Sequence, residues 1–240
     1  MSLASISIII PARDEEAHLP ACLKSIELAK TGLSKPIEII VVLNRCTDRT
    51  EEIAKAAGCK VVNCDAKNLA AIRNTGAKAA SGEILLTLDA DSRMSKNCLI
   101  KIVQALESEK YVGGGVWIIP ERLSLGIFLT GLMILPKILR YRVLCGLFFC
   151  RKTDFEAING FNENLVSVED IDFGIRLKRY GKTIRKGYKN FFLAYITTSC
   201  RKFDHFGDWY FVRHPKLVMD LLKGGTQKDA DHIWYDFPRK

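Results

Sequence analysis

The chain has 240 residues, of which 48% are hydrophobic and 26% charged, an ordinary composition for a globular protein able to bury a full core. Lys and Arg outnumber Asp and Glu by 36 to 27, so the net charge of +9 favours anionic partners such as phosphorylated ligands or membrane surfaces. The sequence has no basic helix interleaved with aromatic residues and no recognisable nucleic-acid motif. We therefore expect no nucleic-acid partner.

The cysteines and the start of the sequence indicate where the protein works. Eight cysteines are present, but they form no C-x-x-C pair and no cluster with histidine at zinc-binding spacing. The first residues, Met-Ser-Leu-Ala-Ser, run directly into a strand pattern without a secretory signal. These features predict a reducing, cytoplasmic setting.

Strand and helix patterns alternate through the first half of the chain. Short β-branched runs predict buried strands, and longer segments with apolar residues at helical spacing predict helices. In chain order, the expected strands cover 6–10, 37–43, 60–63, 83–88 and 111–118, and the expected helices cover 15–30, 47–58, 68–80 and 96–109. Asp48 and Glu51 are spaced as a capping box at the start of the second helix.

This order predicts an α/β fold with a mainly parallel central sheet and helices on both faces. Ligands of such sheets bind beyond the carboxyl ends of the strands. Three polar segments fall there: Pro11-Ala12-Arg13, Asn44-Arg45-Cys46 and Asp89-Ala90-Asp91. Their convergence predicts the position of a ligand site.

The third of these segments carries the strongest chemical signal. Residues two apart on a strand project the same way, so Asp89 and Asp91 can reach one point beyond the strand end. Two carboxylates this close repel unless a cation lies between them, and a hard divalent ion would complete its shell with water and phosphate oxygens. The alternative is a turn in which an aspartate serves as a helix N-cap, because residues 92–95 precede a predicted helix.

Residues 123–150 change in character. Thirteen uncharged residues, 123–135, precede Lys137, Arg140 and Arg142. A membrane span needs about 20 apolar residues, so this run is too short to cross a bilayer. Two interpretations stay open: a buried helix or hairpin of the core, or an interfacial helix whose basic residues meet anionic head groups. The second would place the protein peripherally at the inner face of a membrane.

Five segments in order make the chain resemble the inverting family 2 glycosyltransferases of the GT-A fold. The matching segments are Ser7–Glu16, Val42–Thr50, Ala71–Gly76, Asp89–Asp91 and Val168–Leu177. The resemblance implies a nucleotide-sugar donor, a divalent metal (Mn²⁺ or Mg²⁺) and inversion at the anomeric carbon. It also implies one domain over 1–240, with a nucleotide-binding half, 1–120, and an acceptor-binding half, 121–240, that contains the hydrophobic segment 123–150.

The resemblance also assigns roles to residues. The residues matched to the donor nucleotide are Pro11, Ala12, Arg13, Glu15, Asn44, Asp48 and Asp89, and Arg73 is assigned to the donor for its positive charge rather than from the resemblance. Asp91, with Asp89, matches the metal-binding pair, and Asp170 matches the catalytic base, with Glu169 beside it. Lys67, Arg201 and Lys202 would add positive charge near the diphosphate.

The segment around Asp170 has a structural alternative. Ser167 and Asp170 fit a helix N-cap with an acid at the third position, and Glu169 and Asp172 suit the first turn of a helix. Three acids in four positions exceed what capping requires, so we favour a functional role. The choice of Asp170 over Glu169 rests on the resemblance.

Two departures from the family pattern limit the donor and the reaction. Leu43 stands where many relatives have an acid next to the nucleobase, so the nucleobase of the donor can be either uracil or guanine. The C-terminal part lacks the Q-x-x-R-W element of polymerising relatives, so we expect a single sugar transfer to an acceptor hydroxyl on a lipid-linked, glycan or other substrate.

The alternatives are a nucleotidyltransferase, disfavoured because residues 11–16 are acidic and lack glycine, or a non-catalytic, membrane-associated nucleotide-binding scaffold. The oligomeric state stays open.

Overall fold

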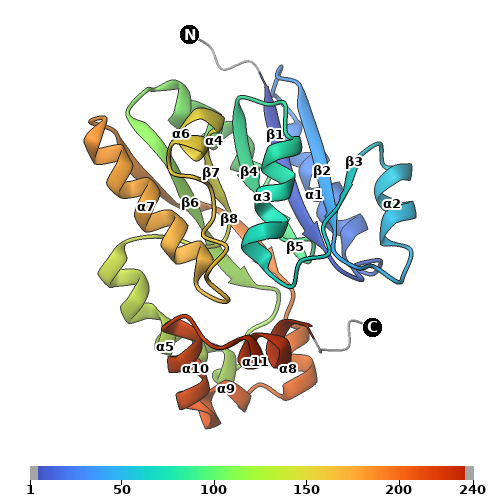
Figure 1. Ribbon diagram of the computed structural model, residues 1–240, viewed down its shortest axis with the longest axis vertical. Helices are drawn as coiled ribbons and strands as arrows, with labels where there is room; N and C mark the ends of the chain where they lie inside the picture. Colours follow the sequence, from blue (N-terminus) through green and yellow to red (C-terminus); the bar gives the residue numbers. More distant parts are fainter. Residues whose placement is uncertain (1–4, 236–240) are drawn as a thin grey trace.

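The computed structural model of the protein describes residues 5–235 and is built around one eight-stranded sheet (Figure 1). The strands are β1 (Ile6–Ala12), β2 (Ile37–Leu43), β3 (Lys60–Asn63), β4 (Ile84–Thr87), β5 (Ser92–Met94), β6 (Tyr111–Pro120), β7 (Phe148–Arg151) and β8 (Gly187–Thr198). The helices are α1 (Leu19–Lys30), α2 (Thr50–Ala56), α3 (Leu69–Ala79), α4 (Cys98–Glu107), α5 (Leu125–Tyr141), α6 (Lys152–Ala157), α7 (Glu169–Thr183), α8 (Arg201–Phe206), α9 (Tyr210–Arg213), α10 (Pro215–Leu222) and α11 (Gln227–Ala230), followed by a π-helical turn at Asp231–Tyr235.

The sheet confirms the expected α/β fold with a mainly parallel centre. Its strand order is β3-β2-β1-β4-β7-β6-β8-β5. The pairs β1–β2, β1–β4, β2–β3 and β6–β8 are parallel, whereas β7 runs antiparallel between β4 and β6, and β5 runs antiparallel to β8. Because β7 comes from the second half of the sequence and lies between strands of the first half, both halves contribute to one sheet.

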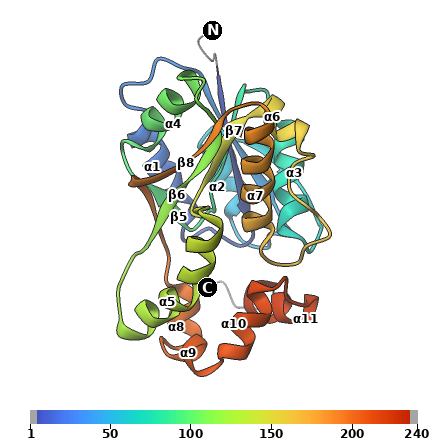
Figure 2. The same ribbon diagram turned by 90° about the vertical axis from the view of Figure 1, so that its left-hand side faces the viewer.

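Helices cover both faces of the sheet, and each face has its own hydrophobic core (Figure 2). Alternation along β1 divides its side chains: Ile8 and Ile10 pack on the α1 and α4 side, and Ile9 packs on the α3 and α7 side. All three are fully buried. This burial fixes the register of β1 and therefore the position of the loop that follows it.

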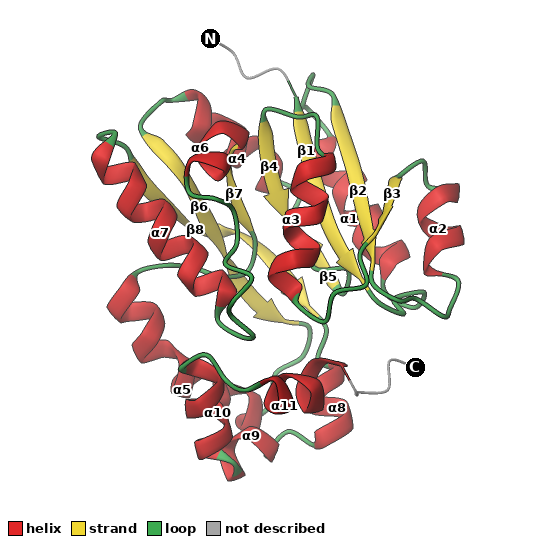
Figure 3. Cartoon of the chain, viewed as in Figure 1, coloured by secondary structure: helices red, strands yellow, loops and turns green. Residues whose placement is uncertain are grey.

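A group of helices lies beyond the carboxyl ends of β1, β2 and β4, at the bottom of Figures 1 and 3. It consists of α5 and α8 to α11, and we call it the helical lobe. Phe211, Val218 and Ile233 form its small buried core, with Met133 of α5 packed against them. The lobe closes the side of the sheet where ligands of α/β folds bind.

Several local expectations differ from the structure. Strands β5, β7 and β8 were not expected, and α1 begins at Leu19, four residues later than its pattern suggested. The expected capping box at α2 is wrong: Asp48 instead accepts hydrogen bonds from the backbone and hydroxyl of Thr50 and from the backbone N–H of Glu16. Asp48 thus holds the loop after β1 against the start of α2.

The hydrophobic segment 123–150 divides into two parts, and only the second is buried in the core of the sheet. Its last residues enter the core as β7, where Phe148 and Phe149 are buried. Its first part forms α5, in which Leu125 is 62% exposed and Leu139 64% exposed. Within residues 5–235, no helix combines the length and apolar character that crossing a membrane requires.

Candidate active site

A cavity of about 260 Å³ lies between the carboxyl ends of the strands and the helical lobe. Ten of the eleven residues assigned from the sequence line it: Pro11, Ala12, Arg13, Glu15, Asn44, Arg73, Asp89, Asp91, Glu169 and Asp170. Asp48 is the exception, because it holds the neighbouring loop instead. The fold thus brings together carboxylates and guanidinium groups from distant parts of the chain.

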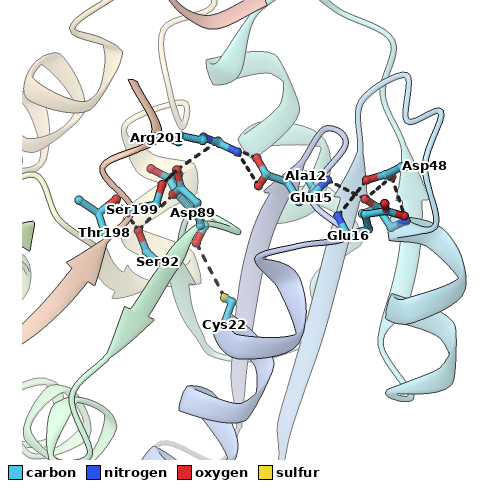
Figure 4. Close-up of polar contacts among 12 residues, drawn as sticks. Ala12, Glu15, Glu16, Cys22, Asp48, Asp89, Ser92, Thr198, Ser199 and Arg201 are labelled. Atoms are coloured by element: carbon cyan, nitrogen blue, oxygen red, sulfur yellow. Dashed lines mark hydrogen bonds and ion pairs between the residues drawn. The ribbon is translucent and has the colours of Figure 1, made fainter. Parts of the chain in front are cut away.

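Asp91 is held in a fixed position by Ser199 and Arg201, two neighbours that Figure 4 labels. Its Oδ2 accepts a hydrogen bond from Ser199 Oγ at 3.1 Å, and its backbone carbonyl accepts one from Ser199 N. Arg201, the first residue of α8, lies 3.1 Å from the same Oδ2 and donates two 2.8 Å hydrogen bonds to Glu15. One guanidinium therefore joins the loop after β1 to the residue that ends the D-x-D segment.

Arg73 contacts both the D-x-D segment and the start of α7. From α3, its Nη2 donates to Asp89 Oδ1 at 3.0 Å and its Nη1 donates to Glu169 Oε1 at 2.9 Å. Burial alone would lower the pKa of Arg73, but the charges of Asp89, Glu169 and Asp170 outweigh it and raise the pKa. Arg73 is therefore a permanent buried cation that ties the D-x-D segment to the start of α7.

The start of α7 differs from the expected cap. Val168 occupies the cap position in a left-handed conformation with φ of 58°, and Ser167 donates its hydroxyl to the carbonyl of Leu221 in the helical lobe. Glu169 and Asp170 therefore face the cavity without a capping role for Ser167.

The two acids at the start of α7 have perturbed acidity. Burial, followed by repulsion from Asp170, raises the pKa of Glu169 to about 7 against the opposing effect of Arg73. Burial also raises the pKa of Asp170, opposed by Arg73 and by the N–H of Ile171. Acids with such perturbed pKa values in a cavity mark a candidate site of proton transfer.

Asn44 lines the cavity but uses its side chain within the protein. The amide is buried and donates to the carbonyls of Cys64 and Ala66, and its oxygen accepts from Arg45. Asn44 therefore positions the loop after β3, and this loop borders the same end of the sheet.

Two arginines that line the cavity each have a buried nitrogen without a hydrogen-bond partner. Among the described side chains, Nε of Arg73 and Nε of Arg201 are buried without a hydrogen-bond partner. Buried donors are costly to leave unpaired, and these two belong to guanidinium groups that line the cavity. The cavity is therefore chemically suited to an anionic ligand.

The D-x-D carboxylates suit a divalent cation that shares its shell with a ligand. Asp89 uses Oδ1 for Arg73 and its side chain is 48% exposed, so it stays open to the cavity. Mg²⁺ is commonly held by one or two carboxylates together with phosphate and water oxygens, which matches a pair without a third protein ligand. The cluster of Asp14, Cys46 and Asp48 lies outside the cavity lining, and its two acids accept loop hydrogen bonds.

The sequence did not reveal the full role of the segment after β8. Arg201 was expected only as a nearby positive charge, and Ser199 was not singled out. Their place depends on β8, whose irregular pattern hides a twelve-residue strand that carries Ser199 and Arg201 to the edge beside Asp91. No short-range signal marks this long-range pairing.

Solved structures show that the fold is that of the GT-A glycosyltransferases. The S. aureus protein TarS in complex with UDP matches with a TM-score of 0.63 and 19% identity, over 97% of this chain and 70% of that chain. Glucosyl-3-phosphoglycerate synthase from Mycobacterium tuberculosis, with Mn²⁺, UDP and phosphoglyceric acid, matches with a TM-score of 0.60 and 19% identity, over 91% of this chain and 77% of that chain.

Residues 7–150 match the family described as Glycosyl transferase family 2, and the chain belongs to this family. A Staphylococcus haemolyticus protein named 4,4'-diaponeurosporenoate glycosyltransferase is 37% identical over 120 residues, 45% of this chain and 30% of the relative. Dolichol-phosphate mannosyltransferase of Pyrococcus furiosus is 29% identical over 170 residues, 64% of this chain and 48% of the relative. The aligned regions thus span less than half of either relative.

Proposed function

We propose that the protein transfers a single sugar from a UDP- or GDP-sugar to an acceptor hydroxyl, with inversion at the anomeric carbon. One observation carries the proposal: Arg73 joins Asp89 and Glu169 through two short ion pairs. This bridge holds the carboxylates assigned to the donor close to the acids assigned to the acceptor. The family membership favours sugar transfer over nucleotidyl transfer.

The donor diphosphate would lie against the D-x-D segment. Asp91, with Asp89, would hold a divalent ion, and this ion when bound would neutralise charge on the departing diphosphate. Arg201 and Arg73, whose guanidinium groups line the cavity, bring positive charge to the same anion. Similar solved structures contain Mn²⁺ with UDP, or GDP-mannose with Mn²⁺, which supports Mn²⁺ or Mg²⁺ here without choosing the nucleobase.

Asp170 is the proposed catalytic base. Its carboxylate takes the proton from the acceptor hydroxyl as the oxygen attacks the anomeric carbon from the face opposite the diphosphate, and the diphosphate leaves with the bonding electron pair. The raised pKa of Asp170 makes it a stronger base. Glu169 is held by Arg73 and acts as a positioning residue for Asp170.

The acceptor is proposed to be carried by a lipid. Curated relatives are named for dolichol phosphate and undecaprenyl phosphate. The proposed acceptor oxygen is a hydroxyl of a lipid-linked glycan, which needs a base; a phosphate oxygen, which is already ionised, is the competing acceptor. The proposal also treats residues 1–240 as one catalytic domain, because both halves share the sheet.

The first test is a calorimetric titration with UDP, GDP and ATP, with and without Mn²⁺. We expect UDP or GDP to bind in the micromolar range, about −8 kcal/mol, only with Mn²⁺. Asp91→Ala should abolish this binding, whereas Asp65→Ala, an exposed acid outside the cavity lining, should not. Equal affinity without metal, or retained binding in Asp91→Ala, would overturn the proposal.

A further inference from the structure

Helix α5 presents an apolar row to solvent. Leu125, Phe128, Leu132 and Leu139 are 62%, 56%, 44% and 64% exposed. Their spacings of three, four and seven residues place them on one side of a helix. We call these four residues the α5 row. Single exposed leucines need no explanation, but a contiguous apolar row on one helix marks an interaction surface.

The opposite side of α5 already has its partners within the protein. Ile127 and Thr130 are buried, and Met133 packs against the core of the helical lobe. Lys137 donates to the carbonyl of Leu222 at the end of α10. The α5 row is therefore not needed to hold the lobe together, and its exposure stays unexplained by the fold.

Charge indicates what covers the row. No acidic residue occurs from Leu123 to Arg151, and Arg140 and Arg142 are exposed at the C-terminal end of α5. This composition complements an anionic surface. A second copy of the chain would bring the same basic residues and the same net charge of +9 against them, so like charges oppose self-association through this face.

We propose that the α5 row docks on a bilayer containing anionic lipids, with the helix lying in the plane of the interface. The four apolar side chains would enter the boundary of the acyl region while Arg140 and Arg142 meet the head groups. With 17 residues, α5 is about 25 Å long, which suits an in-plane helix.

Docking would also bring the membrane close to the cavity. The charge of Lys137, on α5, acts on Asp170, and α10 beside it accepts a hydrogen bond from Ser167 at the cavity wall. A lipid-linked acceptor would then reach the base across the helical lobe. This consequence rests on the proposed sugar transfer, whereas docking itself does not.

Vesicle co-sedimentation tests the proposal with the whole chain. We expect the protein to pellet at low salt with vesicles of phosphatidylcholine and phosphatidylglycerol. Binding should weaken as salt rises, because the arginine contribution is screened, and it should weaken with phosphatidylcholine alone. No pelleting with the anionic vesicles at low salt would overturn the proposal.

Matched variants test whether vesicle binding depends on the α5 row in particular or on exposed apolar side chains in general. Combining Leu125→Gln, Phe128→Gln and Leu132→Gln should lower vesicle partitioning at least about tenfold. The control combines Ile118→Gln, Phe192→Gln and Leu193→Gln, three side chains 43%, 63% and 78% exposed on β6 and β8 rather than on α5. It should partition like the wild type. An equal loss in both triple variants would contradict the assignment.

An arginine variant and a measurement of the oligomeric state complete the test of membrane docking. The double variant Arg140→Gln and Arg142→Gln should bind anionic vesicles about tenfold or more weakly and lose most of the salt dependence. Sedimentation velocity without lipid should show the same monomer for wild type and the α5-row variant; a dimer that only this variant dissociates would overturn the proposal in favour of self-association. Thermal unfolding confirms that each variant is folded, and nucleotide binding that is unchanged in all of them keeps this test separate from the donor site.

Discussion

Nη2 of Arg201 lies 3.1 Å from Oδ2 of Asp91, so a cation supplied by α8 occupies the space beside the carboxylate expected to bind metal. The same guanidinium is fixed by two hydrogen bonds to Glu15. A divalent ion that binds Asp91 must share or displace this contact. Arg201 therefore couples the proposed metal position to α8 of the helical lobe.

Replacing Arg201 by alanine should change metal and nucleotide binding in opposite directions. Without nucleotide, removal of the competing cation should raise Mn²⁺ affinity about tenfold. With Mn²⁺ present, affinity for UDP or GDP should fall, because the diphosphate loses a donor. Manganese paramagnetic resonance and calorimetry measure the two affinities. Arg93→Ala, which breaks an exposed pair with Glu121, is the control; a weaker Mn²⁺ affinity in Arg201→Ala would refute the competition.

Arg73 should be among the most sensitive positions for stability. Above about pH 7, where Glu169 is ionised, Arg73→Ala leaves this side chain, only 10% exposed, without its counter-ion, and such a loss costs about 3–5 kcal/mol. Urea unfolding measures the difference. Arg93→Ala should cost at most about 1 kcal/mol in the same assay because its pair is exposed. Similar losses in the two variants would mean that Arg73 does not carry the buried bridge.

The acidity of Glu169 predicts how stability depends on pH. Its pKa is raised from 4.5 to about 7 in the folded protein, so between these values the native state holds a proton that the unfolded chain releases. The free energy of unfolding therefore falls as pH rises through this window, by on the order of 3 kcal/mol from this group. Glu169→Gln should flatten the fall in urea unfolding between about pH 5 and pH 7.5. Glu52→Gln, on an exposed part of α2, should keep the wild-type slope; an unchanged slope in Glu169→Gln would contradict the raised pKa.

The sequence predicted the parts of the fold that depend on local pattern. The β-branched run of β1 and the continuous apolar run of β2 identify buried parallel strands, and the carboxyl-edge rule then places Asp89 and Asp91 beside the cavity that the structure shows. Strands β7 and β8 were not predicted from the sequence because their formation depends on pairing with other strands of the sheet. β7 is four residues long, and β8 contains register shifts against β6 that interrupt its alternation.

In the candidate site, too, local sequence pattern identified some residues, whereas their long-range contacts could not be predicted. Arg73 could be chosen from its motif, but its bridge to Glu169 spans 96 residues of sequence and becomes visible only when α3 and α7 share one face of the sheet. Ser167 looked like a helix cap, and its hydroxyl instead bonds Leu221 in the helical lobe. Tertiary contacts overruled the local preference in that case.

Asp170→Asn should distinguish the two kinds of acceptor oxygen. With a glycan hydroxyl as acceptor, loss of the base should lower kcat by about 10²–10⁴ while donor affinity changes little. With a polyprenyl phosphate, whose oxygen needs no deprotonation, the same variant should lose much less. Transfer assays with both acceptors measure this. Asp172→Asn is the matched control, because that acid pairs with Arg176 and lies outside the cavity lining; a parallel loss of donor binding in Asp170→Asn would indicate a structural role.

Gly114 and Gly131 form a matched pair that tests how tightly β6 is enclosed. A Cβ on Gly114 would lie 1.9 Å from the carbonyl oxygen of Lys189 on β8, whereas a Cβ on Gly131 of α5 meets nothing within 4 Å. Gly114→Ala should therefore destabilise the protein by at least about 2 kcal/mol, because strand backbone must move. Gly131→Ala should stabilise it by about 0.5–1 kcal/mol through helix propensity. Urea unfolding of both variants decides the point: if Gly114→Ala were tolerated as well as Gly131→Ala, β6 could not lie between β7 and β8 at the spacing that carries Ser199 and Arg201 to Asp91.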